Sequence, residues 1–281
     1  MKMAQQSLGQ MATLACLLEV SAPKPGNVHR GADFEDLTFY DFQTSAVAIG
    51  PVFDLAKQLR VGSLVLAAIQ ATQSVVSTNT NLGLMLLMAP LAKATVFDET
   101  AMPIVMNELT AADAQDIYQA IALADAGGMG EVESMDITDA APDSLLEAMS
   151  AAQDHDLIAA QYGNGFVDLF ADAVRPLREK LEAGMILTEA IVETHVQFMS
   201  RHPDSLIARK CGVEIAEEAA RRARVVVDAR AQGLDFYVRD LSELDFWLRS
   251  DGHRRNPGTT ADFIGAAIFV GLIEGWLPTE Q

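Results

Sequence analysis

The chain has 281 residues; half are hydrophobic, only 6% are aromatic, and the formal net charge is −19 at pH 7. Such a charge argues against a nucleic-acid-binding protein, which would show a basic stripe. The sequence has no run of roughly 20 apolar residues, the length that a membrane span needs. Two cysteines are too few for a disulfide framework. We therefore expect a cytoplasmic protein, and the length fits one domain over residues 1–281.

Apolar residues recur at three- and four-residue spacings along most of the chain, which is typical of amphipathic helices. Two-residue alternation is scarce, and only Val225–Val227 and Phe236–Val238 are strand candidates. We therefore predict an all-α fold, a single multi-helix bundle with its active site in the loops between helices. The acidic segment Asp125–Asp143 is predicted to be a long loop or a lid. The predicted helices lie near residues 5–20, 40–60, 62–77, 82–95, 110–125, 143–161, 164–182, 186–200, 212–231, 239–250 and 259–274.

The first polar loop follows the first predicted helix and reads Glu19-Val-Ser-Ala-Pro-Lys-Pro-Gly-Asn-Val-His-Arg-Gly-Ala-Asp33. Pro23 and Pro25 stop the helix and stiffen the loop. A surface turn between two helices would explain the prolines and glycines equally well, but it leaves the density of hydrogen-bonding side chains unexplained. The residues that we expect around phosphates, with carboxylates nearby, are Lys24, Asn27, His29, Arg30, Asp33 and Asp36.

A second polar loop, Ser77-Thr-Asn-Thr-Asn-Leu-Gly83, lies between two very apolar helices. Thr80 or Asn81 could cap the helix that begins near Leu82. Capping accounts for one of these side chains, not for two asparagines and two threonines. A helix N-terminus also favours a phosphate or a polarised hydroxyl, so Asn79, Thr80 and Asn81 are candidate ligand-binding residues.

A third segment, Asp204-Ser-Leu-Ile-Ala-Arg-Lys-Cys-Gly212, places Arg209 and Lys210 about one and a half helical turns beyond Asp204. Both basic side chains are candidate phosphate ligands. The alternative is an ordinary helix C-terminus, at which basic residues and a glycine stop are common.

A fourth segment, Gly252-His-Arg-Arg-Asn-Pro-Gly-Thr-Thr-Ala-Asp262, precedes an apolar run. Thr259 or Thr260 is predicted to cap the helix, and its free N–H groups beside the arginines would suit a polyphosphate. Asp262 would repel phosphate, so it fits better as a cap partner or as a ligand to Mg²⁺ that bridges the phosphates. An ordinary capped helix is the alternative.

Other catalytic motifs are absent from the sequence. The five histidines are dispersed without an H-E-x-x-H pattern, and no G-x-S-x-G, P-loop or strand-linked G-x-G-x-x-G occurs. The sequence therefore lacks the motifs that usually indicate a zinc enzyme, a serine hydrolase, a P-loop kinase or a Rossmann dehydrogenase.

Three of these segments, in this order, resemble blocks of the triphosphoribosyl-dephospho-CoA synthase family. Residues 19–30 are similar to its E-V-x-x-x-P-K-P-G-L-V-D-R, residues 204–212 to D-T-N-x-x-x-R-G-G, and residues 256–262 to N-P-G-T-x-A-D-L. The resemblance spans nearly the whole chain. The sequence lacks the histidine of the family's G-A-H-x-D-M and reads N-T-N-L-G where the family has N-T-H-K-G. These departures indicate a divergent subgroup, similar to members carried by archaea and one-carbon-metabolising bacteria.

The resemblance implies a transferase that moves a 5-triphosphoribosyl unit from ATP to the 2′-hydroxyl of 3′-dephospho-CoA and releases adenine. Displacement at an anomeric carbon needs a carboxylate near the developing cation and positive charge around the phosphates. The candidate catalytic carboxylates and Mg²⁺ ligands are Asp33, Asp36 and Asp262. The candidate substrate- and phosphate-binding residues are Lys24, Asn27, His29, Arg30, Asn79, Thr80, Asn81, Arg209, Lys210 and Asn256.

Two alternatives stay open on the sequence. The same fold could act on a different, pterin-type acceptor, or the chain could be a non-catalytic nucleotide-binding protein, which the lost histidines would favour. A purely structural scaffold would have no reason to concentrate Asn, Lys and Asp in its helix-start loops. We expect small-molecule nucleotide partners with ATP as substrate, no nucleic acid and no membrane, and homo-oligomerisation stays open.

Overall fold

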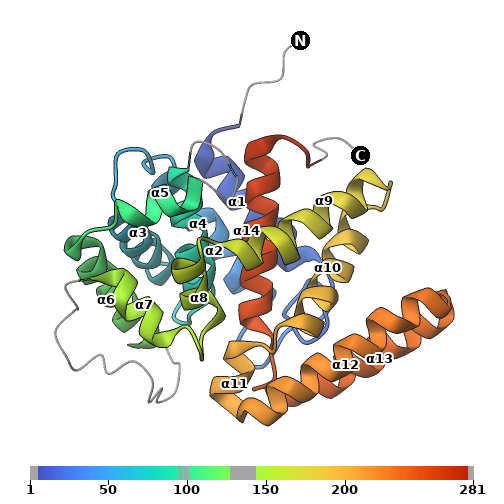
Figure 1. The fold of residues 1–281 in the computed structure, drawn as a ribbon. Coiled ribbons are helices and arrows are strands. Elements are labelled where there is room, and N and C mark those ends of the chain that lie inside the picture. Colours follow the sequence, from blue (N-terminus) through green and yellow to red (C-terminus); the bar gives the residue numbers. More distant parts are fainter. Residues whose placement is uncertain (1–5, 95–96, 98–100, 127–143, 278–281) are drawn as a thin grey trace.

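The computed structural model describes residues 6–94, 97, 101–126 and 144–277. Within these ranges the chain is 73% helical, which confirms the all-α prediction (Figure 1). The loop or lid predicted over Asp125–Asp143 falls mainly on residues 127–143, outside the described part, while residues 125 and 126 belong to a helix. None of the described helices is long and apolar enough to cross a membrane.

The helices in chain order are α1 (Leu8–Ser21), α2 (Phe39–Phe53), α3 (Val61–Gln73), α4 (Leu82–Lys93), α5 (Ala101–Asn107), α6 (Ala111–Ala126), α7 (Leu145–Ala152), α8 (Leu157–Asn164), the π-helical segment η1 (Leu169–Val174), α9 (Arg175–Glu182), α10 (Leu187–Arg201), α11 (Ser205–Cys211), α12 (Val213–Gln232), α13 (Leu234–Arg249) and α14 (Gly258–Glu274). A short extended segment, β1 (Ser250–His253), joins α13 to the loop before α14.

Local capping chemistry sets several helix starts. Ser7 accepts a hydrogen bond from the Gln10 N–H, while the Gln10 side chain accepts from the Ser7 N–H, so that α1 begins with a capping box. Thr38 and Asp41 form the same arrangement at the start of α2. Asp156 caps α8 and divides the predicted helix 143–161 into α7 and α8.

Both strand predictions are wrong, because Val225–Val227 lies inside α12 and Phe236–Val238 inside α13. Val226 is 1% exposed, whereas Val225 is 56% exposed. Neighbouring branched residues therefore face different directions, as on a helix, and the packing of one of them outweighs the strand propensity of the triplet. The short helices α5 and α11 were not predicted, because fewer than three turns give little periodic signal.

Helix α14 occupies the centre of the molecule (Figure 1) and packs against α1, α4, η1, α10 and α11. It is buried nearly all round from Phe263 to Leu272, as expected of an apolar helix in a core. Gly265 permits close packing, since a Cβ there would lie 2.8 Å from the Leu84 Cδ1 of α4. The N-terminal turn of this rigid helix carries part of the candidate site.

A smaller hydrophobic cluster joins α10, α11, α12 and α13, in which small alanines of α12 face apolar side chains of the neighbouring helices. The α12–α13 hairpin lies along one side of the molecule in Figure 1. Leu241 packs against both this cluster and the main core. The single-domain organisation stays a prediction.

Candidate active site

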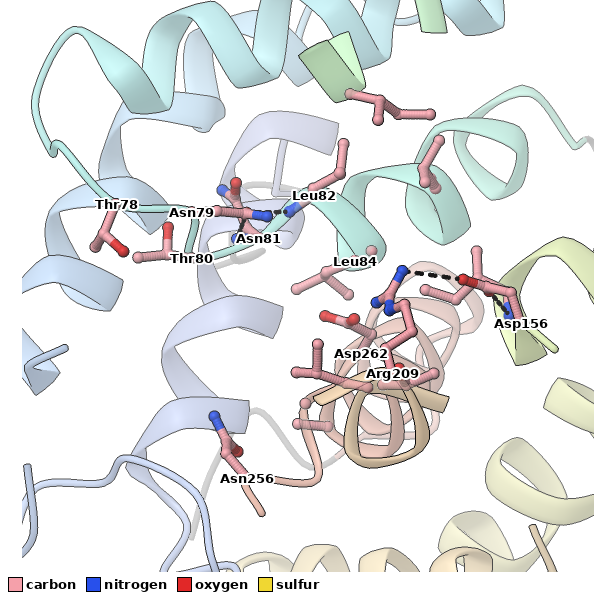
Figure 2. Close-up of a pocket in the computed structure, with 18 of the residues that line it drawn as sticks. Thr78, Asn79, Thr80, Asn81, Leu82, Leu84, Asp156, Arg209, Asn256 and Asp262 are labelled. Atoms are coloured by element: carbon pink, nitrogen blue, oxygen red, sulfur yellow. Dashed lines mark hydrogen bonds and ion pairs between the residues drawn. The ribbon is translucent and has the colours of Figure 1, made fainter. Parts of the chain in front are cut away.

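A cavity of about 540 Å³ lies among the ends of helices from both halves of the sequence. All four polar segments singled out above contribute to its wall. Figure 2 shows Thr78–Leu82 along one side, with Arg209, Asp262 and Asn256 opposite. The predicted site residues that line the cavity are Asn27, Asp36, Asn79, Thr80, Asn81, Arg209, Lys210, Asn256 and Asp262.

Four predicted residues do not line this cavity. Lys24 is fully buried beneath it, and Arg30 is exposed. The His29 ring nitrogen Nδ1 accepts a hydrogen bond from the Gly31 N–H at 3.1 Å. The Asp33 carboxylate accepts from the Phe39 N–H at 2.6 Å and so stabilises the start of α2. These positions give no support to the substrate-binding or catalytic roles predicted for Lys24, His29, Arg30 and Asp33.

Asn27 joins the first polar loop to the last one. Its Nδ2 donates to the Asn256 Oδ1 at 2.6 Å and to the Pro257 carbonyl at 3.4 Å. Arg249 donates to the Asn27 carbonyl, which fixes the loop against α13. The Asn27 side chain is almost completely buried, yet its Oδ1 has no partner among the described residues. A buried acceptor of this kind on a cavity wall suits a donor from a ligand.

The buried Asp204 carboxylate caps two helices at once. Its Oδ1 accepts from the Leu206 and Ile207 N–H groups at the start of α11. Its Oδ2 accepts from the N–H and the hydroxyl of Thr260, at 2.7 and 2.8 Å, in the first turn of α14. The prediction that Thr259 or Thr260 caps α14 is therefore wrong, because the capping oxygen comes from a distant segment.

The second loop is held by its own asparagines. Asn79 Oδ1 accepts from the Asn81 and Leu82 N–H groups, so Asn79 rather than Thr80 or Asn81 caps α4. Asn81 exchanges hydrogen bonds with the Thr72 hydroxyl of α3, and Thr80 donates to Ser45 of α2. These side chains lie on the cavity wall but are held mainly by protein partners.

Asp262 lies in the first turns of α14 and faces the N-terminal turn of α4. A Cβ on Gly83 would lie 2.1 Å from the Asp262 Oδ2, so only glycine permits this approach. Burial raises the pKa of the Asp262 carboxyl well above its ordinary value, and the nearby carboxylates of Glu19, Asp204 and Asp156 raise it further. This cavity group is therefore a carboxylic acid that keeps its proton at a higher pH than usual.

Positive charge enters the cavity from α11. Arg209 forms an ion pair with Asp156 across 3.4 Å. Lys210 is half-buried on the wall, and its ammonium has no hydrogen bond or ion pair within the described ranges. Burial, and then the neighbouring Arg209, lowers the pKa of Lys210. An ammonium without a protein partner is available to an anionic ligand.

The three acids predicted to bind a metal do not form a cluster. Asp33 accepts from the Phe39 N–H at the start of α2, Asp36 pairs with His253 at 2.8 Å, and only Asp36 and Asp262 of the three line the cavity. Over the described part of the chain, no group of three or more His, Cys, Asp or Glu side chains could hold a metal ion. The residues therefore do not fit a preformed Mg²⁺ cage, and we assign none of these acids as a metal ligand.

Part of the lining was not predicted. One side of the cavity is apolar and comes from α6, α7 and α8, with Tyr118, Ile121, Met149 and Ile158 among its residues. In the sequence these residues look like ordinary core positions. Glu19 also lines the cavity, although only its place in the first polar segment could have indicated that.

Comparisons with known proteins identify the family of the chain. The model of the family ATP:dephospho-CoA triphosphoribosyl transferase matches residues 5–281. The fold is similar to that of an Archaeoglobus fulgidus protein assigned as a triphosphoribosyl-dephospho-CoA synthase, with a TM-score of 0.62 and 25% identity over 83% of this chain and 98% of that one. No curated protein matches. The chain belongs to the ATP:dephospho-CoA triphosphoribosyl transferase family of enzymes, which transfer a triphosphoribosyl unit from ATP to dephospho-CoA.

Proposed function

We propose that the transfer takes place in this cavity, with Asp262 as the acid that protonates the departing adenine. In the reaction the acceptor oxygen bonds to the ribose C1′ and its hydroxyl proton is released, while the C1′–N9 bond breaks. Adenine leaves with the bonding electron pair and takes the proton of Asp262, which is later restored from solvent. The observation that carries this assignment is the raised pKa of Asp262 in a cavity wall, because a general acid must hold its proton until the transition state.

The triphosphate lies on the α11 side of the cavity in this proposal. Lys210 supplies a positive charge that forms no ion pair within the described residues. Arg209 can turn from Asp156 toward a phosphate at little cost, since their separation is 3.4 Å. The Asn27 Oδ1 accepts a hydrogen bond from a ribose or acceptor hydroxyl. The apolar side formed by α6, α7 and α8 receives the adenine ring or the apolar part of the acceptor.

Mg²⁺ enters with the nucleotide in this account. Mg²⁺ commonly keeps several waters and binds through substrate phosphates with one or two protein carboxylates. No part of the proposed proton transfer depends on it. A cytoplasmic location stays a prediction from the sequence, which leaves homo-oligomerisation open.

Replacing Lys210 by Met should raise KM for ATP about tenfold, because one charge-assisted contact contributes roughly 1.5 kcal/mol. The kcat value should change less than threefold, since the phosphates lie away from the reacting carbon. The matched control is Lys57→Met, an exposed lysine between α2 and α3. Steady-state adenine release at varied ATP concentrations measures both constants. Equal KM values for ATP in the wild type and Lys210→Met would refute the placement of the triphosphate against this wall.

A further inference from the structure

Glu19 and Lys24 form a buried ion pair immediately beneath the cavity. The Lys24 Nζ lies 2.9 Å from the Glu19 Oε1, with exposed side-chain fractions of 0% and 9%. The same ammonium donates to the carbonyls of Glu19 and Ala22, at the C-terminal end of α1. An ammonium has three donors, so all three are used. Lys24 therefore cannot contact a phosphate without breaking this arrangement.

The pair leaves one carboxylate oxygen available. Glu19 lines the cavity, and its Oε2 has no hydrogen-bond partner among the described side chains and backbone groups. The Glu19 side chain lies beside Gly265 of α14, since a Cβ there would be in ordinary contact with the Glu19 Cγ, at 3.4 Å. Gly265 is one helical turn beyond Asp262. Glu19 and Asp262 thus approach the cavity from α1 and α14 respectively.

We propose that Glu19 is a second catalytic carboxylate, facing the ribose C1′, and that Lys24 is the positioning residue that holds it there. This inference rests on the proposed function of the cavity. Glu19 takes the proton of the attacking hydroxyl as the new C1′–O bond forms, and its negative charge stabilises the positive charge that develops on the sugar. Glu19 afterwards releases this proton to solvent, and adenine takes one from Asp262, so the overall proton balance is unchanged.

Glu19 and Asp262 have different charged neighbours. Among the charged neighbours of Asp262, Glu19 contributes most to raising the pKa of Asp262. Burial and then the same two carboxylates raise the pKa of the Cys16 thiol, which lies on the cavity wall. Desolvation and the Lys24 ammonium both lower the pKa of the fully buried His195, so this ring does not compete with Glu19 as a charged partner. Glu19 is the carboxylate that neutralises Lys24 in the described structure.

The test compares Glu19→Gln, Lys24→Met and the double variant, with the exposed Glu108→Gln as control. Glu19→Gln should lower kcat for adenine release at least 100-fold and change KM for ATP less than threefold. Lys24→Met should lower kcat at least tenfold in the wild-type background but less than threefold in Glu19→Gln, because it acts through Glu19. An equal effect in both backgrounds would overturn the positioning role of Lys24.

Thermal unfolding provides a second readout. Lys24→Met leaves an unpaired buried carboxylate and should lower Tm by about 10 °C, whereas the double variant should recover most of that loss because both charges are gone. Failure of the double variant to recover would show that Lys24 stabilises the fold through packing or its carbonyl hydrogen bonds rather than by neutralising Glu19. The kcat values are therefore measured well below the lowest Tm.

Binding of unreactive sugar mimics separates this inference from the proposed function. The probes are the cationic 1,4-iminoribitol 5-triphosphate and its uncharged 1,4-anhydroribitol counterpart. The wild type should prefer the cation at least tenfold, and Glu19→Gln should lose most of that preference. An unchanged preference, or a Glu19→Gln kcat within threefold of wild type, would overturn the role of Glu19. A different outcome would refute the proposed function instead. In that outcome the protein shows no acceptor-dependent adenine release, yet its preference for the cation still depends on Glu19, which keeps Glu19 facing the sugar.

Discussion

Replacing Asp262 by Asn should lower kcat for adenine release by about 100- to 1,000-fold, because general acid catalysis contributes a factor of this order. The amide keeps the size of the side chain and can still donate a weak hydrogen bond, but it cannot transfer a proton. The wild-type kcat should fall as pH rises through the raised pKa of Asp262, since the acid must be protonated. That alkaline fall should be absent from the variant. A kcat within threefold of wild type would refute the assigned role.

The same substitution should stabilise the fold, which distinguishes loss of catalysis from damage. The pKa of Asp262 is raised in the folded state and ordinary in the unfolded chain. Between these two values unfolding releases a proton, so its contribution to wild-type stability falls as pH rises across that window. Asp262→Asn removes this fall. Its Tm should therefore exceed that of the wild type increasingly toward higher pH, by about 2–4 °C for each kcal/mol of relief. Calorimetry at several pH values measures the difference.

Replacing Asp204 by Ala should destabilise the fold by about 2–4 kcal/mol, because one side chain caps two helices. The variant leaves the Leu206, Ile207 and Thr260 N–H groups without their carboxylate. Asp204→Asn should cost less, since its amide oxygen can still cap one of the two helices.

The matched control for this prediction is Ser7→Ala, which removes a single, exposed cap from α1. It should cost about 1 kcal/mol or less. Urea unfolding of the two variants gives the comparison. Equal costs for Asp204→Ala and Ser7→Ala would contradict the double cap.

The fold class could be predicted from the sequence because the helical period repeats along most of the chain. The four polar segments were also visible, since prolines, glycines and asparagines gather where helices end. What the sequence does not contain is the distance between these segments. Asp204 and Thr260 share a cap across 56 positions, and Asn27 and Asn256 share a hydrogen bond across 229. Such pairs arise only from tertiary packing.

Lys24 illustrates the same limit at a single residue. A lysine between two prolines in a polar loop has the composition expected of a phosphate-binding residue. In the structure the prolines turn the chain back, and the ammonium binds the end of α1 and the Glu19 carboxylate. The spacing of residues in the sequence could not show whether the Lys24 side chain points toward the cavity or into the protein interior. The apolar side of the cavity was missed for a similar reason, because Ile121 and Met149 look like core residues until the helices that carry them are placed.

The most direct test of the account is adenine release from ATP, followed by chromatography, with and without 3′-dephospho-CoA. The account predicts that adenine appears only when the acceptor is present and in equal amount to the acceptor consumed. The product mass should equal that of dephospho-CoA plus one triphosphoribosyl unit, and Asp262→Asn should form it at least 100-fold more slowly. Adenine release at the same rate without the acceptor, or an unaltered acceptor after complete consumption of ATP, would contradict it.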